Sequence, residues 1–195
     1  INLEGVHELN QVFFEDVRVP KKNRVGKEND GWSVAKYLLE FERFSLSSVE
    51  IRRVLARIEK LANQTGSDGA RLKDVTSFTQ ELARLKVDAD ALEVSEQRVL
   101  ANLSAGMPPG SASSIQMARG SEVQQRADML GVEAAAYYAS PLQPEALELG
   151  TNRPPVGPEL AVTLMPAYLS NRMRTIAGGS SEIQRNIIAK AVLGI

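Results

Sequence analysis

The chain has 195 residues with 43% apolar side chains, which suffices for a packed core, and a formal net charge of −1 without a basic tract, which argues against binding nucleic acid or an anionic membrane surface. It contains no Cys and one His, which excludes disulfides, thiolate nucleophiles and metal sites built on Cys or on two His. We interpret His7 as a surface or sheet residue, and no apolar run reaches the ~18 residues of a membrane span.

The first part of the chain predicts a strand. Residues 11–19 are rich in β-branched and aromatic side chains and are followed by Pro20. A single strand is not stable alone, so we expect its sheet partners to precede Ile1. The chain also begins without Met, and we therefore expect it to be a piece of a longer protein.

Apolar residues at helical spacing dominate the remainder of the chain. They predict helices over residues 31–63, 75–103, 113–138, 159–173 and 182–193, joined by loops rich in glycine, proline and polar residues. The helix over 75–103 alternates steps of three and four, which is typical of coiled-coil-like packing within a bundle. At the start of the last helix, Ser181 and Gln184 have the spacing of a capping box.

These elements predict an all-α fold. We expect an up-down four-helix bundle over residues 29–195, preceded over residues 1–28 by a linker and the end of a truncated middle β domain.

Glu42 is a candidate catalytic residue because it stands in an apolar stripe between Leu38 and Leu46. A carboxylate in such a place must be paired, protonated or facing a cavity. Two interpretations stay open: an ion pair with an Arg of another helix, or a general base with a raised pKa. Glu96 and Glu122 have similar interior positions, and we interpret both as structural.

The second candidate is the segment of residues 177–181, in which Gly178 and Gly179 lead into the last predicted helix. Glycines let the backbone approach a ligand closely, and N–H groups at a helix start suit oxyanions. The alternative is a plain helix-to-helix turn with a glycine C-cap and a serine N-cap.

Four segments together resemble the C-terminal part of an acyl-CoA dehydrogenase. They are residues 10–20 (NQVFFEDVRVP), Gly31-Trp32, Phe41-Glu42-Arg43 and residues 177–190 (AGGSSEIQRNIIAK), in matching order and separation. The resemblance covers nearly the whole chain, and within the family it is most similar to the large subunit of pimeloyl-CoA dehydrogenase. It implies the last strand of a middle β domain followed by the C-terminal four-helix bundle.

The resemblance implies FAD-dependent α,β-dehydrogenation of an acyl-CoA thioester, in which a Glu removes the α-proton while FAD takes the β-hydride. Many members carry this Glu where the chain has Gly178. Others, similar to isovaleryl-CoA dehydrogenases, carry it at the position of Glu42, which is therefore the implied base. Arg43 then lies near the CoA moiety, and the Gly178 N–H polarises the thioester carbonyl together with a flavin hydroxyl.

The same comparison implies FAD contacts for Gly179, Ser180 and Glu182. Two family motifs for the neighbouring subunit's FAD are missing, however: Arg-x-x-Phe-Gly, expected within residues 63–74, and Gln-x-x-Gly-Gly, expected near Leu130-Gly131. We therefore predict a hetero-oligomer whose other subunit type supplies these contacts, with a homotetramer as the alternative.

The resemblance also implies an acyl-CoA substrate, an electron-transfer flavoprotein or similar acceptor, and a bacterial cytoplasmic location, with the mitochondrial matrix as the alternative. We expect the chain alone to be inactive, because the residues that cradle the isoalloxazine ring would lie upstream. Two other functions stay open: a non-catalytic scaffold or pseudoenzyme subunit with an ion-paired Glu42, and a flavin oxidase or oxygenase on the same fold.

Overall fold

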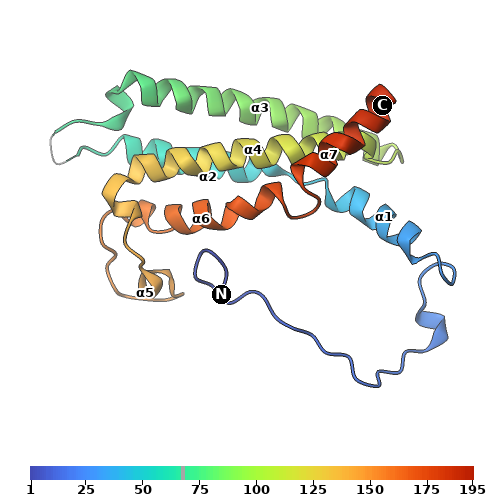
Figure 1. Ribbon diagram of the computed structural model, residues 1–195. Coiled ribbons are helices and arrows are strands. Elements are labelled where there is room, and N and C mark those ends of the chain that lie inside the picture. The colour runs from blue at the N-terminus through green and yellow to red at the C-terminus, as the bar shows by residue number, and fades with distance from the viewer. Residues whose placement is uncertain (67–68) are drawn as a thin grey trace.

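The computed structural model describes residues 1–66 and 69–195 (Figure 1). Its main body is a helical bundle in which α4 (Gly110–Ala135) packs against α2 (Ser47–Ala62), α3 (Thr76–Ser104), α6 (Leu164–Ser170) and α7 (Ser181–Ile188). The predicted all-α bundle is therefore confirmed, with α4 as its central helix.

Shorter elements complete the chain. They are α1 (Gly31–Glu42), α5 (Pro144–Leu147), the 3-10 segments η1 (Lys21–Asn23), η2 (Leu72–Asp74), η3 (Ala136–Ala139), η4 (Glu159–Ala161) and η5 (Asn171–Thr175), and the π-helical end η6 (Ala189–Leu193). The predicted helix over 159–173 is thus a composite of η4, α6 and η5. None of the helices described here is long and apolar enough to cross a membrane.

The core follows the periodicity of the sequence. On α3, apolar residues alternate at spacings of three and four residues, as predicted, and this places one stripe of the helix inside the bundle. The buried stripe consists of Phe78, Leu82, Leu85, Ala89, Leu92, Glu96 and Val99. α2 contributes Ile51, Leu55 and Ile58, whereas the facing side of α4 carries mostly small residues. Small residues on α4 allow several helices to approach it closely.

The predicted helix over 31–63 is wrong in one respect, because the structure divides it into α1 and α2. The break follows Glu42, and Leu46 has φ −83° and ψ 63°, outside the helical region. α2 has a buried stripe, whereas α1 has no buried residue. The helices α1 and α2 have different packing partners, which explains why the apolar stripe in the sequence rotates between these two helices.

The strand predicted over residues 11–19 is also wrong. The structure shows no strand within residues 1–66 and 69–195. Phe13 and Phe14 are 77% and 80% exposed, and no other described segment pairs with this backbone. β-propensity alone does not make a strand, because a strand needs a neighbouring backbone to accept and donate its hydrogen bonds.

Glu96 and Glu122 have the structural roles predicted from the sequence. The buried carboxylate of Glu96 accepts the Ser48 N–H at 3.0 Å and also the Ser48 hydroxyl, so α3 caps the start of α2. Glu122 forms ion pairs with Arg119 at 2.7 Å and with Arg185 at 2.8 Å, which joins α4 to α7.

Candidate functional site

The double-glycine turn, residues 177–180, connects η5 to α7. Gly178 has φ +69° and Gly179 has φ +100°, both in the region that favours glycine. A Cβ at Gly178 would lie 2.6 Å from Met117 Cε, and one at Gly179 would lie 2.6 Å from Gln184 Nε2. Both glycines are therefore required by backbone conformation, and a side chain at either position would also displace the end of Met117 or Gln184.

The polar groups of this turn divide into bonded carbonyls and free N–H groups. Gln184 Nε2 donates to the carbonyl oxygens of Gly178 and Gly179, at 3.1 Å each. Among the residues that the structure describes, the N–H groups of Gly178 and Gly179 have no hydrogen-bond partner. The turn can therefore donate hydrogen bonds to an oxygen atom of a ligand.

Ser180, rather than Ser181, is the N-cap of α7. Its hydroxyl oxygen accepts the Ile183 N–H at 3.5 Å, whereas Ser181 and Gln184 are buried. The capping box predicted for Ser181 and Gln184 is therefore wrong. Its physical reason is that the Gln184 side chain bonds the glycine carbonyls instead of reaching back to a backbone N–H at the cap.

Glu182 follows in the first turn of α7 and is exposed. Its pKa is lowered, mainly because its carboxylate accepts a hydrogen bond from its own backbone N–H and also from the Ser180 hydroxyl. This carboxylate is thus ionised at neutral pH and can accept hydrogen bonds from a ligand.

Glu42 is the last residue of α1 and does not occupy the buried position predicted for it. The side chain is exposed, and its stripe neighbours Leu38 and Leu46 are 56% and 48% exposed. Within the described chain no Arg forms an ion pair with Glu42. The predicted stripe from Leu38 to Leu46 is thus interrupted where α1 ends, and the described residues leave the Glu42 side chain exposed.

Arg43 is half-buried and carries an unsatisfied donor. Its Nε is enclosed and has no hydrogen-bond partner among the described residues. Buried polar atoms are normally bonded, so this guanidinium is a candidate to bind an anionic group of a ligand.

The segments that carry Glu42 and Gly178 both approach the first half of α4. The Glu40 carboxylate accepts the Gly110 N–H at 2.8 Å, and Met117 lies against Gly178. Ser121 Oγ donates to the carbonyl oxygen of Arg174 at 3.0 Å, which holds η5 to the same part of α4. In Figure 1 the end of α1 and the start of α7 accordingly lie at the same end of the bundle.

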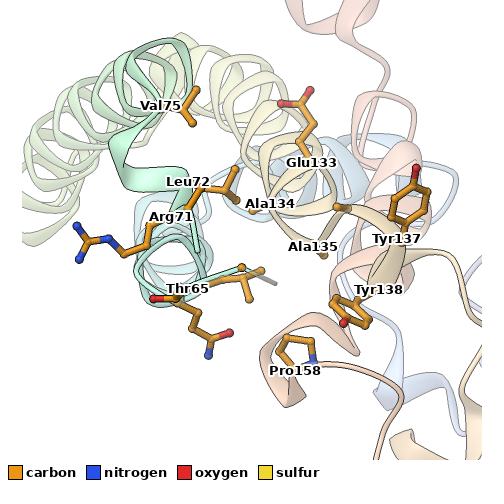
Figure 2. A pocket seen from close by; sticks show the side chains of 15 residues that line it. Thr65, Arg71, Leu72, Val75, Glu133, Ala134, Ala135, Tyr137, Tyr138 and Pro158 are labelled. Carbon is orange, nitrogen blue, oxygen red and sulfur yellow. The ribbon is translucent and has the colours of Figure 1, made fainter. Parts of the chain in front are cut away.

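A separate cavity of about 630 Å³ lies at the C-terminal end of α4 (Figure 2). It lies between the ends of α2 and α4 and residues of η2 and η3, and Leu72, Ala134 and Tyr138 line it. The two missing FAD motifs were expected in these same stretches. Arg71 is the one cation among the described lining residues and is already paired with Asp74 at 2.9 Å, while Glu133 adds a negative charge. The cavity therefore does not suit the diphosphate of FAD.

Sequence analysis did not identify three features of these sites: Gln184 as a partner of the glycine carbonyls, Met117 as the side chain below Gly178, and the cavity. The one signal for Gln184 in the sequence was its spacing from Ser181, which predicted a capping box instead. The other two depend on contacts between segments far apart in the sequence.

Comparisons with known proteins agree with the fold. The family profile described as "Acyl-CoA dehydrogenase, C-terminal domain" matches residues 29–193. Acyl-CoA dehydrogenase FadE26 of Mycobacterium tuberculosis is 31% identical over 189 residues, which cover 94% of this chain and 44% of FadE26. Acyl-CoA dehydrogenase IpdE1 of the same organism is 31% identical over 197 residues, covering 100% of this chain and 46% of IpdE1.

Solved structures show the same relationship. A chain of the ChsE4-ChsE5 complex from M. tuberculosis has a TM-score of 0.73 and 29% identity, with 94% of this chain and 45% of that chain covered. Butyryl-CoA dehydrogenase from Megasphaera elsdenii, at 22% identity and TM-score 0.73 over 92% of this chain and 43% of its own, shares the fold. The chain spans less than half the length of the relatives it matches. The match over residues 29–193 shows that the chain belongs to the acyl-CoA dehydrogenase family and contains its C-terminal domain.

Proposed function

We propose that the protein containing this chain is a FAD-dependent acyl-CoA dehydrogenase subunit in which Glu42 is the catalytic base. The observation that carries this proposal is the unpartnered N–H of Gly178 in a turn that packs on the same half of α4 as the segment bearing Glu42. Proton removal beside a thioester carbonyl requires a carboxylate and an oxyanion donor in one site, and the segments that carry these two groups both contact the first half of α4.

In the proposed reaction, the Glu42 carboxylate takes the α-proton of the acyl-CoA while the Gly178 N–H donates to the thioester oxygen. Such a donor stabilises the enolate-like transition state by about 2.7–4 kcal/mol in comparable oxyanion holes. Bound FAD would supply the acceptor for the β-hydride. An acyl chain lying along α1 would cover Glu42 and exclude water from its carboxylate.

The remaining site residues would hold the two ligands. The half-buried Arg43 guanidinium, with its unsatisfied Nε, would bind the CoA moiety. The free N–H of Gly179, the Ser180 hydroxyl and the ionised Glu182 offer donors and an acceptor that suit the polar adenine end of FAD.

A hetero-oligomer follows from the cavity at the other end of α4. Because its charges do not suit the diphosphate of a neighbouring FAD, we infer that a second subunit type completes the flavin sites. A related protein of known structure is a complex of two chains, ChsE4 and ChsE5, which supports this arrangement. We further propose an electron-transfer flavoprotein or similar acceptor and, from the mycobacterial relatives, a bacterial cytoplasmic location.

Replacing the base tests the proposed reaction. Glu42→Gln, made in the full-length protein together with any partner subunit, is expected to lower kcat about 10²–10⁴-fold with unchanged FAD content, because the amide cannot accept the proton. Glu40→Gln is the matched control on the same helix, since its amide oxygen can still accept the Gly110 N–H. Turnover by Glu42→Gln equal to that of the control would exclude Glu42 as the base.

The alternative functions predict different flavin chemistry. A scaffold subunit would not bleach flavin absorbance when acyl-CoA is added under anaerobic conditions. A flavin oxidase would bleach it and then form hydrogen peroxide in air. The proposed dehydrogenase bleaches the flavin and passes the electrons to an added acceptor with little peroxide.

A further inference from the structure

Gln184 is a buried amide with an unusual set of contacts. Its side chain has 0% exposure, and Nε2 donates to two successive carbonyl oxygens, those of Gly178 and Gly179, at 3.1 Å each. Its Oε1 has no partner in the described part of the chain. The amide therefore acts here only as a donor, and both bonds end on the double-glycine turn.

These two bonds restrict the turn on one side of Gly178. A peptide group is planar, so a fixed carbonyl also fixes the N–H of the following residue. Gln184 thus orients the N–H groups of Gly179 and Ser180. Without these hydrogen bonds, the backbone of two successive glycines would rotate with little steric resistance, and the peptide planes after Gly178 would be free to turn.

The other side of Gly178 is held by the backbone. The Ala177 N–H donates to the carbonyl oxygen of Met173 at 2.8 Å, and Met117 lies against the Cα of Gly178. The peptide group that carries the Gly178 N–H therefore lies between two anchored peptide groups, and this N–H has no hydrogen-bond partner among the described residues. An N–H held in this way needs no rearrangement when it meets a developing oxyanion.

We propose that Gln184 is a positioning residue that preorganises the oxyanion donor of this site without touching the substrate. This inference rests on the proposed function, since it assigns Gln184 its role through the Gly178 N–H. Removing the amide would leave the fold in place but let the turn adopt other conformations, so that the donor is misaligned in the transition state.

Gln184→Met tests the proposal, because it keeps the length and volume of the side chain and removes both donors. In the flavin-loaded protein with any partner subunit, we expect kcat to fall roughly 100-fold, the effect of a small misplacement of a catalytic group. The kcat values are compared at equal FAD occupancy, because Gln184 also orients the Gly179 N–H that would contact FAD.

A binding comparison isolates the oxyanion contact. The two probes are a 3-thia-acyl-CoA, which has a thioester carbonyl but no β-hydride to give, and the matching thioether, which lacks the carbonyl oxygen. Flavin absorbance reports both affinities. The wild type should bind the thioester more tightly than the thioether, and Gln184→Met should reduce this ratio of affinities about 10-fold.

Gln116→Met is the matched control. Gln116 is also buried, at 1% exposure, and its Nε2 donates to Ser95 Oγ at 2.5 Å between α4 and α3, away from the glycine carbonyls. The Gln116→Met variant loses a buried amide, as Gln184→Met does, but it should retain the preference for the thioester. If Gln184→Met does not fold, Gln184→Glu serves instead, because it keeps the shape and offers at most one donor.

The outcomes separate the two proposals. A wild type that binds thioether and thioester equally contradicts the proposed function itself. If the wild type prefers the thioester and the folded Gln184 variant prefers it equally, only the proposed role of Gln184 is overturned. Equal losses of preference in the Gln184 and Gln116 variants would show a general packing effect and also overturn it.

Discussion

Asp128 is a buried carboxylate that holds α4 to η5, the segment that leads into the double-glycine turn. It accepts hydrogen bonds from Gln124 Nε2 and Asn171 Nδ2, at 2.8 Å each. Burial raises its pKa above the ordinary value of 3.8, although the two hydrogen bonds and the charges of Arg174 and Arg172 act in the opposite direction. The cost of removing this charge from water is therefore the largest effect at this position.

The raised pKa of Asp128 predicts a pH dependence of stability. The folded state binds the proton more tightly than the unfolded state, so this group lowers the free energy of unfolding as the pH rises from about 3.8 through its folded pKa. Asp128→Asn removes that contribution, and its stability relative to the wild type should increase over this range. The difference in the free energy of unfolding between the two proteins is measured by urea unfolding from about pH 3.5 to about pH 7, in steps of roughly half a pH unit. A difference that stays constant with pH would contradict the prediction.

At the scale of the elements, α4 and the start of α2 cross closely at Gly120. A Cβ at Gly120 would lie 2.6 Å from Ser47 Oγ and 2.9 Å from Ser47 Cβ, too close for a real contact. This contact places the beginning of α2, and with it the end of α1 that carries Glu42. Glycine at position 120 is therefore a requirement of helix packing rather than of backbone conformation.

Gly120→Ala should lower the free energy of unfolding by about 1–3 kcal/mol through overpacking. The higher helix propensity of alanine should offset about 1 kcal/mol of this loss. Gly131→Ala is the control on the same helix, because its Cβ would meet the movable methyl Cδ2 of Leu164 at 3.0 Å. Denaturant unfolding of the two variants compares them. A Gly120→Ala protein as stable as Gly131→Ala would show that α2 moves aside without cost.

At the scale of the whole molecule, large apolar side chains remain exposed around α1 and the segment before it. They include Phe13, Phe14, Trp32, Tyr37 and Leu38. Apolar patches of this kind on a folded protein mark surfaces that other protein segments cover. Of these residues, Tyr37 and Leu38 lie on α1, the helix that ends at Glu42, so a segment that covered α1 would also approach the proposed base.

The proposed hetero-oligomer predicts a measurable flavin content. Because the cavity at the end of α4 does not suit the diphosphate of FAD, the native complex should contain two subunit types and less than one FAD per subunit. Native mass spectrometry combined with flavin absorbance gives both numbers. A homotetramer with one FAD per subunit would exclude this arrangement.

The amino-acid sequence by itself determined the features that depend on neighbours along the chain. The alternation of apolar residues over 75–103 predicted α3 and its buried face, since helical spacing is a local property. Gly178 and Gly179 predicted a turn where the backbone must adopt a positive φ. The motif resemblance predicted the family, because it uses residue identity and order rather than contacts.

Only the tertiary structure decided the features that depend on segments distant in sequence. Residues 11–19 have the composition of a strand but no strand to pair with in the described chain, and Glu42 has apolar neighbours but no helix over it. The bonds from Gln184 to the glycine carbonyls and the burial of Asp128 arise in the same way. Burial and pairing are properties of the surface that meets a residue, and no local pattern specifies that surface.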